Sequence, residues 1–325
     1  MKATVVLSGN KEALMRRAGE INPLMEASAE FLTEVSCWIL HEGDPVIPGL
    51  LVSLSKVLEI RVPSSVPSET LLDILTKTAG EEEIDPGDHL FLFPPDSLGE
   101  ELATRLAFRL QGSSCLQAEA LQAGETGIEV PRPCYGSHMK AVIEPGKGPW
   151  CLTPAKTPAR PAKEITPECP VIQRKGGIPS LPPWIKGQVE IPDKPADSLA
   201  GADRLLVLGN GTGSRKNYKN FIPLAEALGA RLAASRPAVM SGWAPMSSLV
   251  GVSGAVVSPS LCIAAGVSGT AVFSVGIRSS DCIVAINTDP DAPIFNTADI
   301  GIVDDMHGVL NALEILLTKH KGNNS

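Results

Sequence analysis

Residues 251–277, GVSGAVVSPSLCIAAGVSGTAVFSVGI, contain one tetrapeptide twice, at 251–254 and at 266–269. The apolar run LCIAA lies between the copies, so the second copy directly follows a segment typical of a strand buried on both faces. Ligands of open α/β sheets bind beyond the carboxyl ends of the strands. Glycines let a backbone approach a ligand closely, and successive N–H groups can surround an anion. The repeat therefore predicts a binding site, although two ordinary Gly/Ser turns would have the same composition.

The C-terminal part of the chain alternates short apolar runs with helical patterns. Strands are predicted at 204–208, 260–265, 282–287 and 300–303. One helix is predicted around Leu224 and Leu228, with Asn220 as its N-cap and Gly229 closing it, and a second over 307–320. This alternation predicts a doubly wound α/β domain.

The N-terminal part has the same texture, with predicted strands at 3–8, 35–40 and 89–93. A helix follows the third strand, and Ser97 with Glu100 forms a capping-box pattern at its start. The fold class is therefore α/β with two domains, the N-terminal one built on a mostly parallel sheet.

A proline-rich segment separates the two parts. Twelve of the 28 prolines lie within 145–195, a density that argues against both a helix and a central strand. The predicted organisation is an N-terminal domain at 1–144, a linker or extended segment at 145–200 and a C-terminal domain at 201–325.

Charge and cysteine content narrow the classes of function. The chain has 36 acidic and 28 basic residues, a net charge of −8, which argues against nucleic acid or an anionic membrane surface as the main partner. No apolar run approaches the length of a membrane span, and the apolar start is too short for a signal peptide. The seven cysteines are scattered without a CxxC, which suits reduced thiols in the cytoplasm.

Motifs for covalent or metal-assisted catalysis are missing from the sequence. The five histidines are dispersed without metal-ligand spacing, and neither GxSxG nor GxxxxGK[ST] occurs. GNGTGS at 209–214 follows a predicted strand but is only a weak dinucleotide-binding signal. These absences favour binding, or chemistry that a cofactor performs.

Several motifs together resemble one family. LCIAAGVSG, CIVAIN, NTDPDAPIF and ADIGIV, with ASRPAVMSGW at 234–243, resemble the C-terminal FAD domain of the electron transfer flavoprotein alpha subunit. PDSLGEELATRLAFRL and RPCYGSHMKAVIE in the N-terminal part are similar to the same family more loosely. The resemblance is most specific from about residue 204 onward.

The resemblance implies FAD as cofactor and assigns roles to a few residues. Ser253 matches a hydroxyl residue near flavin N5, Arg236 would place a permanent cation beside the flavin, and Asn287 and Asp305 match residues that hold the AMP half. The full implied set is Asn210, Ser235, Arg236, Val250, Gly251, Val252, Ser253, Ser268, Gly269, Thr270, Ala271, Val272, Phe273, Asn287, Asp305 and Met306.

The chain departs from the family pattern at several of these positions. Asn210 stands where an arginine is usual, Val272 and Phe273 replace a Gln-His pair, and Val252-Ser253-Gly254 replaces Gln-Thr-Gly. Cys262 takes the place of a common tyrosine. The backbone cradle is retained, whereas several polar contacts to the flavin are lost.

The function that the resemblance implies is electron transfer by an alpha subunit, a carrier rather than a stand-alone enzyme. It would pair with a beta subunit and exchange electrons with a dehydrogenase, often of the acyl-CoA type, or with a reductase. Nucleic acid is not an expected partner, and no insertion into a membrane is expected. Two alternatives are a permanent flavoprotein subunit of a larger reductase complex and a nonredox scaffold that has lost FAD.

Overall fold

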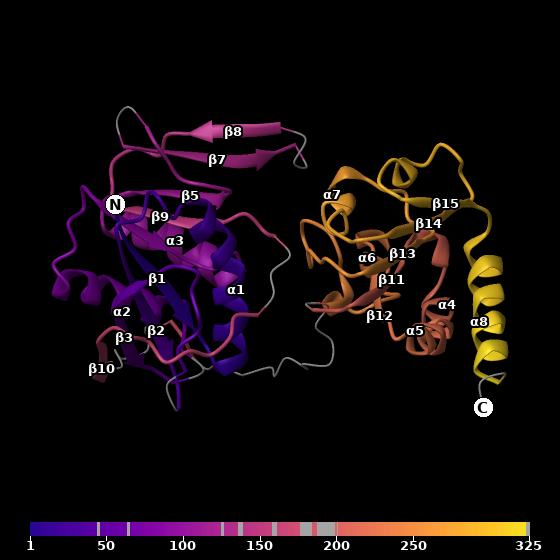
Figure 1. Cartoon of the computed structure of the whole chain (residues 1–325), viewed down its shortest axis with the longest axis horizontal. Helices are drawn as coiled ribbons and strands as arrows, with labels where there is room; N and C mark the ends of the chain where they lie inside the picture. The colour runs from indigo at the N-terminus through magenta and orange to yellow at the C-terminus, as the bar shows by residue number, and fades with distance from the viewer. Residues whose placement is uncertain are drawn as a thin grey trace. The chain divides into compact units, whose positions relative to one another are not determined.

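The chain folds into two compact units, Met1–Pro192 and Asp193–Ser325, which are described separately (Figure 1). The computed structural model describes residues 1–43, 46–63, 66–124, 127–135, 139–157, 161–175, 184–186, 199 and 201–322. The proline-rich segment predicted over 145–200 lies outside the described residues for much of its second half.

A seven-stranded parallel sheet forms the centre of the first unit, in the order β10-β3-β2-β1-β4-β9-β5. Its strands are β1 (Lys2–Ser8), β2 (Glu34–His41), β3 (Leu54–Arg61), β4 (His89–Leu92), β5 (Ser113–Ala118), β9 (Trp150–Pro154) and β10 (Val171–Lys175). Neighbouring strands are parallel throughout, so the prediction of a mostly parallel sheet is confirmed.

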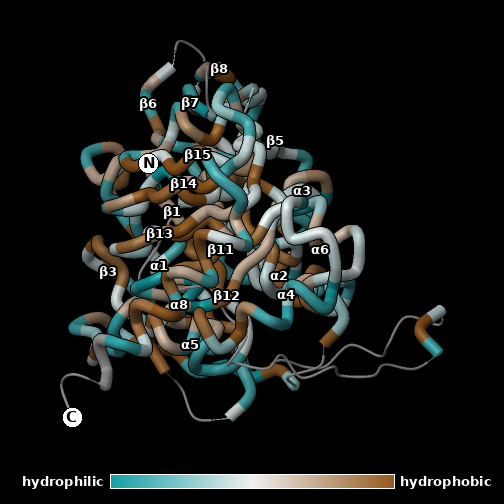
Figure 2. The backbone as a smooth tube through the Cα atoms, turned by 90° about the vertical axis from the view of Figure 1, so that its right-hand side faces the viewer, coloured by the Kyte–Doolittle hydropathy of each residue, from teal (hydrophilic) through white to brown (hydrophobic). Residues whose placement is uncertain are grey.

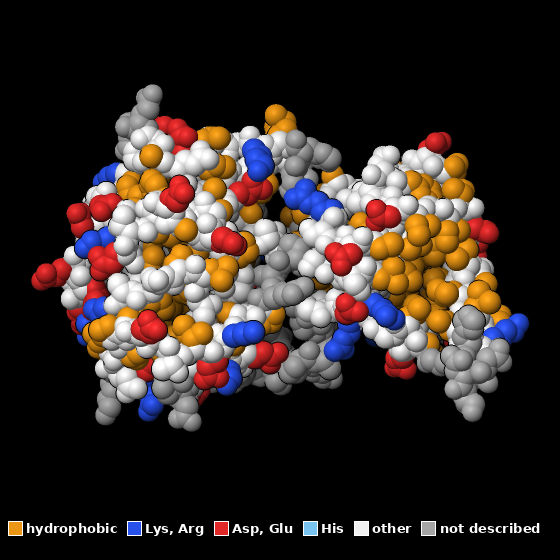
Figure 3. All heavy atoms as spheres, viewed as in Figure 1, with side chains coloured by type: hydrophobic (Ala, Val, Ile, Leu, Met, Phe, Trp, Pro, Cys, Tyr) orange, Lys and Arg blue, Asp and Glu red, His pale blue; other side chains and the backbone are white. Residues whose placement is uncertain are grey.

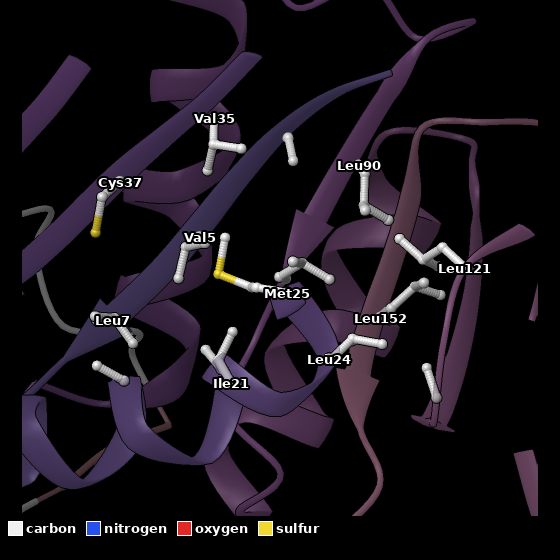
Figure 4. Packing of buried hydrophobic residues seen from close by; sticks show 14 of the residues in the cluster. Val5, Leu7, Ile21, Leu24, Met25, Val35, Cys37, Leu90, Leu121 and Leu152 are labelled. Carbon is white, nitrogen blue, oxygen red and sulfur yellow. The ribbon is translucent and has the colours of Figure 1, made fainter. Parts of the chain in front are cut away.

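Three helices cover both faces of this sheet. Alternate residues of β1 point to opposite sides, with Val5 and Leu7 packing toward α1 (Lys11–Ala27), as Figure 4 shows for this core. Val6 packs on the opposite side with residues of α2 (Ser68–Glu81) and α3 (Ser97–Arg109). A small antiparallel sheet is formed by β6 (Gln122–Ala123), β7 (Ile128–Cys134) and β8 (Met139–Ile143).

Two local predictions in the first unit are wrong. Strand β10 lies inside the predicted proline-rich segment and pairs with β3, and strand β9, also inside this segment, pairs with both β4 and β5 within the sheet. The only proline of β9 is its last residue, Pro154, where the missing N–H does not interrupt the pairing of the other residues. Helix α3 is capped by Asp96, whose carboxylate accepts from Gly99 N at 2.8 Å, and not by Ser97.

The second unit contains a five-stranded parallel sheet in the order β12-β11-β13-β14-β15. The strands are β11 (Arg204–Leu208), β12 (Arg231–Ala234), β13 (Leu261–Ala265), β14 (Ile283–Asn287) and β15 (Ile300–Val303). They are short and apolar, and the tube is largely brown along them in Figure 2. The order reverses between β11 and β13, so the topological switch point lies there, as expected of an open α/β sheet.

Helices pack mainly on one face of this sheet. Leu206 and Leu208 of β11 join a core with α4 (Arg215–Asn220), α5 (Ile222–Leu228), α6 (Arg236–Met240) and α8 (Met306–Gly322). Leu205 and Val207 face the other side, where turns and the short α7 (Ala271–Ser274) pack. The predicted cap at Asn220 is wrong, because Asn220 ends α4 and α5 begins after Phe221 without a side-chain cap.

Apolar side chains are exposed on β15 and α8. Ile300 and Val303 of β15 are 52% and 57% exposed, and Ile315 and Leu316 of α8 are 56% and 59% exposed. Hydrophobic side chains gather over this part of the second unit in Figure 3. Strand β15 is also the last strand of its sheet, with one edge unpaired among the described residues.

Candidate functional site

A cavity of about 870 Å³ opens along the carboxyl edge of the sheet in the second unit. Segments that follow each of the five strands contribute to it. The lining residues are Asn210, Gly211, Ser235, Arg236, Pro237, Met240, Val250, Gly251, Ser253, Gly266, Val267, Ser268, Thr270, Val272, Phe273, Asn287, Thr288, Asp289, Ala292, Pro293, Asp305 and Met306.

The span of the cavity sets the size of the ligand that it suits. Its lining extends from the end of β12 to the end of β15, four strand spacings apart. At about 4.8 Å per spacing, the distance is roughly 19 Å. An extended dinucleotide makes use of this whole length, whereas a mononucleotide would leave part of it empty.

The two GVSG turns meet at this cavity. The Val252 amide of the first turn donates to the Val272 carbonyl, 3.0 Å away, just after the second turn. Gly251 has φ +126°, and a Cβ there would lie 2.9 Å from the same carbonyl oxygen. The repeated turn is therefore explained by two glycine-bearing segments that pack against each other at the edge of one sheet.

Glycines also bring the turn after β11 close to the turn after β13. The Gly211 amide donates to the Gly266 carbonyl at 3.0 Å, and a Cβ on Gly209 would lie 2.0 Å from that oxygen. Gly266 itself has φ +64°. Side chains at these positions would force the two turns apart, so the glycines permit the close approach at the switch point.

Five consecutive amides lie free at the second turn. From Ser268 to Val272, no backbone N–H donates to a protein acceptor in the part of the chain that the structure describes. Ser268, Thr270 and Val272 line the cavity. Such a run of free donors suits an anionic group, for example a pyrophosphate, without needing a lysine.

Charged side chains lie at the two ends of the cavity. Arg236 follows β12, and its side chain forms no ion pair among the described residues. Asp289 and Asp305 follow β14 and β15. A dinucleotide would therefore have a cation near one end and carboxylates, which accept hydrogen bonds from ribose hydroxyls, near the other.

Asn287 and Asp305 also form hydrogen bonds within the protein. Asn287 donates from Nδ2 to the Val267 carbonyl at 2.8 Å and accepts from the Asp289 amide at 3.0 Å, so it links the turns after β13 and β14. Asp305 accepts from the Gly308 amide at 2.9 Å in the first turn of α8. Its second oxygen has no donor among the described residues and remains available to a ligand.

The structure brings most of the predicted site residues together. Thirteen of the sixteen line the cavity, whereas Val252, Gly269 and Ala271 do not. Gly269 instead allows close packing, because a Cβ there would lie 2.1 Å from the Ile294 amide nitrogen. Phe273 is only 6% exposed and belongs to the core below the cavity as well as to its wall.

Nine lining residues were not predicted: Gly211, Pro237, Met240, Gly266, Val267, Thr288, Asp289, Ala292 and Pro293. Each follows a predicted strand or a predicted site residue within a few positions. Listing all residues just beyond the carboxyl ends of the strands would have found most of them.

The site lacks the usual groups for covalent catalysis. The titratable side chains that line the cavity in the described chain are Arg236, Asp289 and Asp305. Cys262 lies within β13 beneath the cavity, and burial raises the pKa of its thiol to about 12, so it stays protonated. No cluster of metal-ligating side chains occurs among the residues that the structure describes. The glycine cradle and the free amides fit a bound cofactor.

Comparison with known proteins agrees with this geometry. Residues 198–278 match the family described as electron transfer flavoprotein FAD-binding domain. The chain is 37% identical over 251 residues to the electron transfer flavoprotein subunit YgcQ of Escherichia coli (strain K12), covering 77% of this chain and 85% of that protein. It is 33% identical over 241 residues to protein FixB of Rhizobium meliloti (strain 1021), covering 71% and 67%. It is also 29% identical over 245 residues to the lactate dehydrogenase (NAD(+),ferredoxin) subunit LctC of Acetobacterium woodii, covering 74% and 58%.

Proposed function

The chain belongs to the electron transfer flavoprotein alpha subunit family, and we propose that its second unit holds one FAD along the carboxyl edge of its sheet. Electron transfer is the function of this family, and FAD, when bound, supplies the redox chemistry. The protein's own residues bind and orient the cofactor and adjust its potential.

The observation that carries the proposal is one cavity with different polar groups along its length: a cation, free amide donors and a carboxylate acceptor. Arg236 would lie near the flavin end, the amides of 268–272 near the pyrophosphate, and Asn287 with Asp305 near the adenosine. Ser253 would add a hydroxyl near the flavin, and Val250 and Phe273 would pack on it.

The proposed partner is a beta subunit in a heterodimer. Exposed apolar residues on β15 and α8 support a partner, since a free sheet edge with exposed Ile300 and Val303 would be open to unwanted association. A dehydrogenase would complete the electron path.

A second candidate is a permanent subunit of a larger reductase complex. The similarity to LctC, whose name places it in a lactate dehydrogenase that uses NAD(+) and ferredoxin, favours it. The two candidate functions predict purified complexes of different size, because a permanent subunit remains attached to its dehydrogenase at high salt. Both need FAD.

Co-expression with the beta subunit, followed by identification of the released flavin, tests the cofactor. One FAD per chain is expected, and FMN should bind far more weakly because it cannot reach both ends of the cavity. Purification without flavin, and no uptake when FAD is added, would instead support a scaffold that has lost the cofactor.

A further inference from the structure

We propose that Met306 and His307, the first two residues of α8, are positioning residues that fix the glycine turn 209–213 at the cavity wall. The proposal rests on the proposed function, because the turn matters to FAD only if FAD occupies the cavity. Neither residue needs to touch the cofactor to act in this way.

Met306 lies beneath two glycine turns at once. Its side chain is 3% exposed and belongs to the helical core of the second unit. A Cβ on Gly266 would lie 2.4 Å from Met306 Sδ, and one on Gly211 would lie 3.1 Å from it. The sulfur therefore occupies the space that the two glycines leave open, and it supports both turns from below.

His307 holds the same turn through a hydrogen bond. Its Nε2 lies 3.2 Å from the Gly211 carbonyl oxygen. A carbonyl only accepts, so Nε2 carries the proton and donates. The imidazole also packs on Phe221, with ring centroids 5.6 Å apart, which restricts its orientation.

Other hydrogen bonds also hold this turn. The Gly209 and Gly211 amides donate to the Ala265 and Gly266 carbonyls at 2.9 and 3.0 Å, and Asn217 Nδ2 donates to the Thr212 carbonyl at 2.8 Å. Within it, Thr212 N donates to Gly209 O and Gly213 N to Asn210 O, both at 3.2 Å. Asn210 lines the cavity and is exposed, and no hydrogen bond of its side chain occurs among the described residues. The contacts from α8 add to these bonds at Gly211, the neighbour of Asn210.

The test uses His307→Phe, His307→Gln and Met306→Leu, with Asn311→Gln as control on the exposed side of α8. His307→Phe keeps an aromatic ring against Phe221 and removes the donor, whereas His307→Gln supplies a donor again. Met306→Leu keeps the volume of the core and changes the shape beneath the glycines.

Two readouts are compared, both in the full chain with its beta subunit. The first is amide hydrogen exchange of peptides covering 205–221 in the FAD-free protein, and the second is the Kd for FAD. We expect severalfold faster exchange and a Kd about three- to tenfold higher in His307→Phe, the range for loss of one hydrogen bond. Met306→Leu should change both in the same direction. His307→Gln should return both toward wild type, and Asn311→Gln should change neither.

Unchanged exchange and Kd in both His307→Phe and Met306→Leu would overturn the proposal. Failure of His307→Gln to restore them would also overturn it, since loss of the hydrogen bond to Gly211 would then not explain the effect of His307→Phe. If wild type takes up no FAD, the proposed function fails, while exchange in the FAD-free protein still decides whether α8 fixes the turn.

Discussion

Arg236 brings a positive charge to the cavity. A cation beside a flavin favours the reduced forms, which carry more negative charge. Arg236→Ala should therefore lower the flavin potential by tens of millivolts, where about 59 mV corresponds to a tenfold change for a one-electron step. Redox titration with a reference dye measures the change.

Arg278→Ala is the matched control for Arg236, because Arg278 is exposed in the same unit and does not line the cavity. It removes the same charge and should leave the potential nearly unchanged. Equal potentials in wild type and Arg236→Ala, with FAD still bound, would mean that Arg236 does not lie near the flavin.

His89 makes the stability of the first unit depend on pH. Its Nε2 lies 2.8 Å from Thr4 Oγ1, and burial, followed by the charge of Lys2, lowers its pKa from 6.5 to about 4. The unfolded chain therefore binds the proton more tightly than the folded one. This contribution is full above pH 6.5 and is lost as pH falls to 4, by about 3 kcal/mol in total.

Urea unfolding at pH 7 and pH 4.5, in wild type and His89→Gln, measures this effect. Glutamine keeps a polar partner for Thr4 and does not titrate. The wild-type free energy of unfolding should fall by roughly 2–3 kcal/mol more than that of the variant. Parallel losses in the two proteins would show that other groups cause the acid sensitivity.

At the scale of elements, the strands were predictable because each is a short apolar run, and β11 and β15 match their predicted bounds. Strand β12, RLAA, was not predicted, since a four-residue stretch with an arginine gives no periodic signal. Strand β9 was not predicted, because prolines lie on both sides of it in the sequence. Its place between β4 and β5 depends on long-range pairing, which local composition does not encode.

The site was predictable where motifs were specific. The turns 250–253 and 268–273 supplied most of the predicted lining residues. Which single residues of a turn line the cavity was not predictable, because Val252, Gly269 and Ala271 belong to the same turns as lining residues but do not line it. The hydrogen bond from His307 to Gly211 was not predictable either, because the two residues lie 96 positions apart in the chain.

Gly276 tests the packing of the two GVSG segments. A Cβ there would lie 2.5 Å from Gly251 N, in the backbone of the first turn. Gly276→Ala should destabilise the second unit by roughly 1–3 kcal/mol through overpacking and should weaken FAD binding. Thermal unfolding and FAD titration measure both effects.

Gly308→Ala serves as the control for Gly276→Ala. Gly308 lies in the first turn of α8, where a Cβ would come only within 3.8 Å of Asp305 Oδ2. Alanine in a helix should leave stability equal or slightly higher. A Gly276→Ala protein as stable as this control would contradict the packing described for the turns.

For the whole molecule, the exposed side chains of β15 lead to a prediction about assembly. Ile300→Lys with Val303→Lys should leave the chain folded, because both side chains are more than half exposed, and should weaken binding to the beta subunit at least tenfold. Co-purification and titration calorimetry measure the affinity. Thr318→Lys, an exposed change on α8, is the control. Equal affinities of the double variant and the wild type would place the beta subunit elsewhere.

No helix in the described chain is long and apolar enough to cross a membrane.

The central claim is that FAD lies in the cavity of the second unit, and a titration of flavin-free protein with FAD tests it most directly. Thr270 is exposed and lines the cavity, so Thr270→Trp would fill the space without disturbing the core. We predict one FAD bound per wild-type chain and at least a tenfold weaker affinity in Thr270→Trp, with unchanged thermal unfolding of the FAD-free proteins. Equal FAD affinity in wild type and Thr270→Trp would contradict the account.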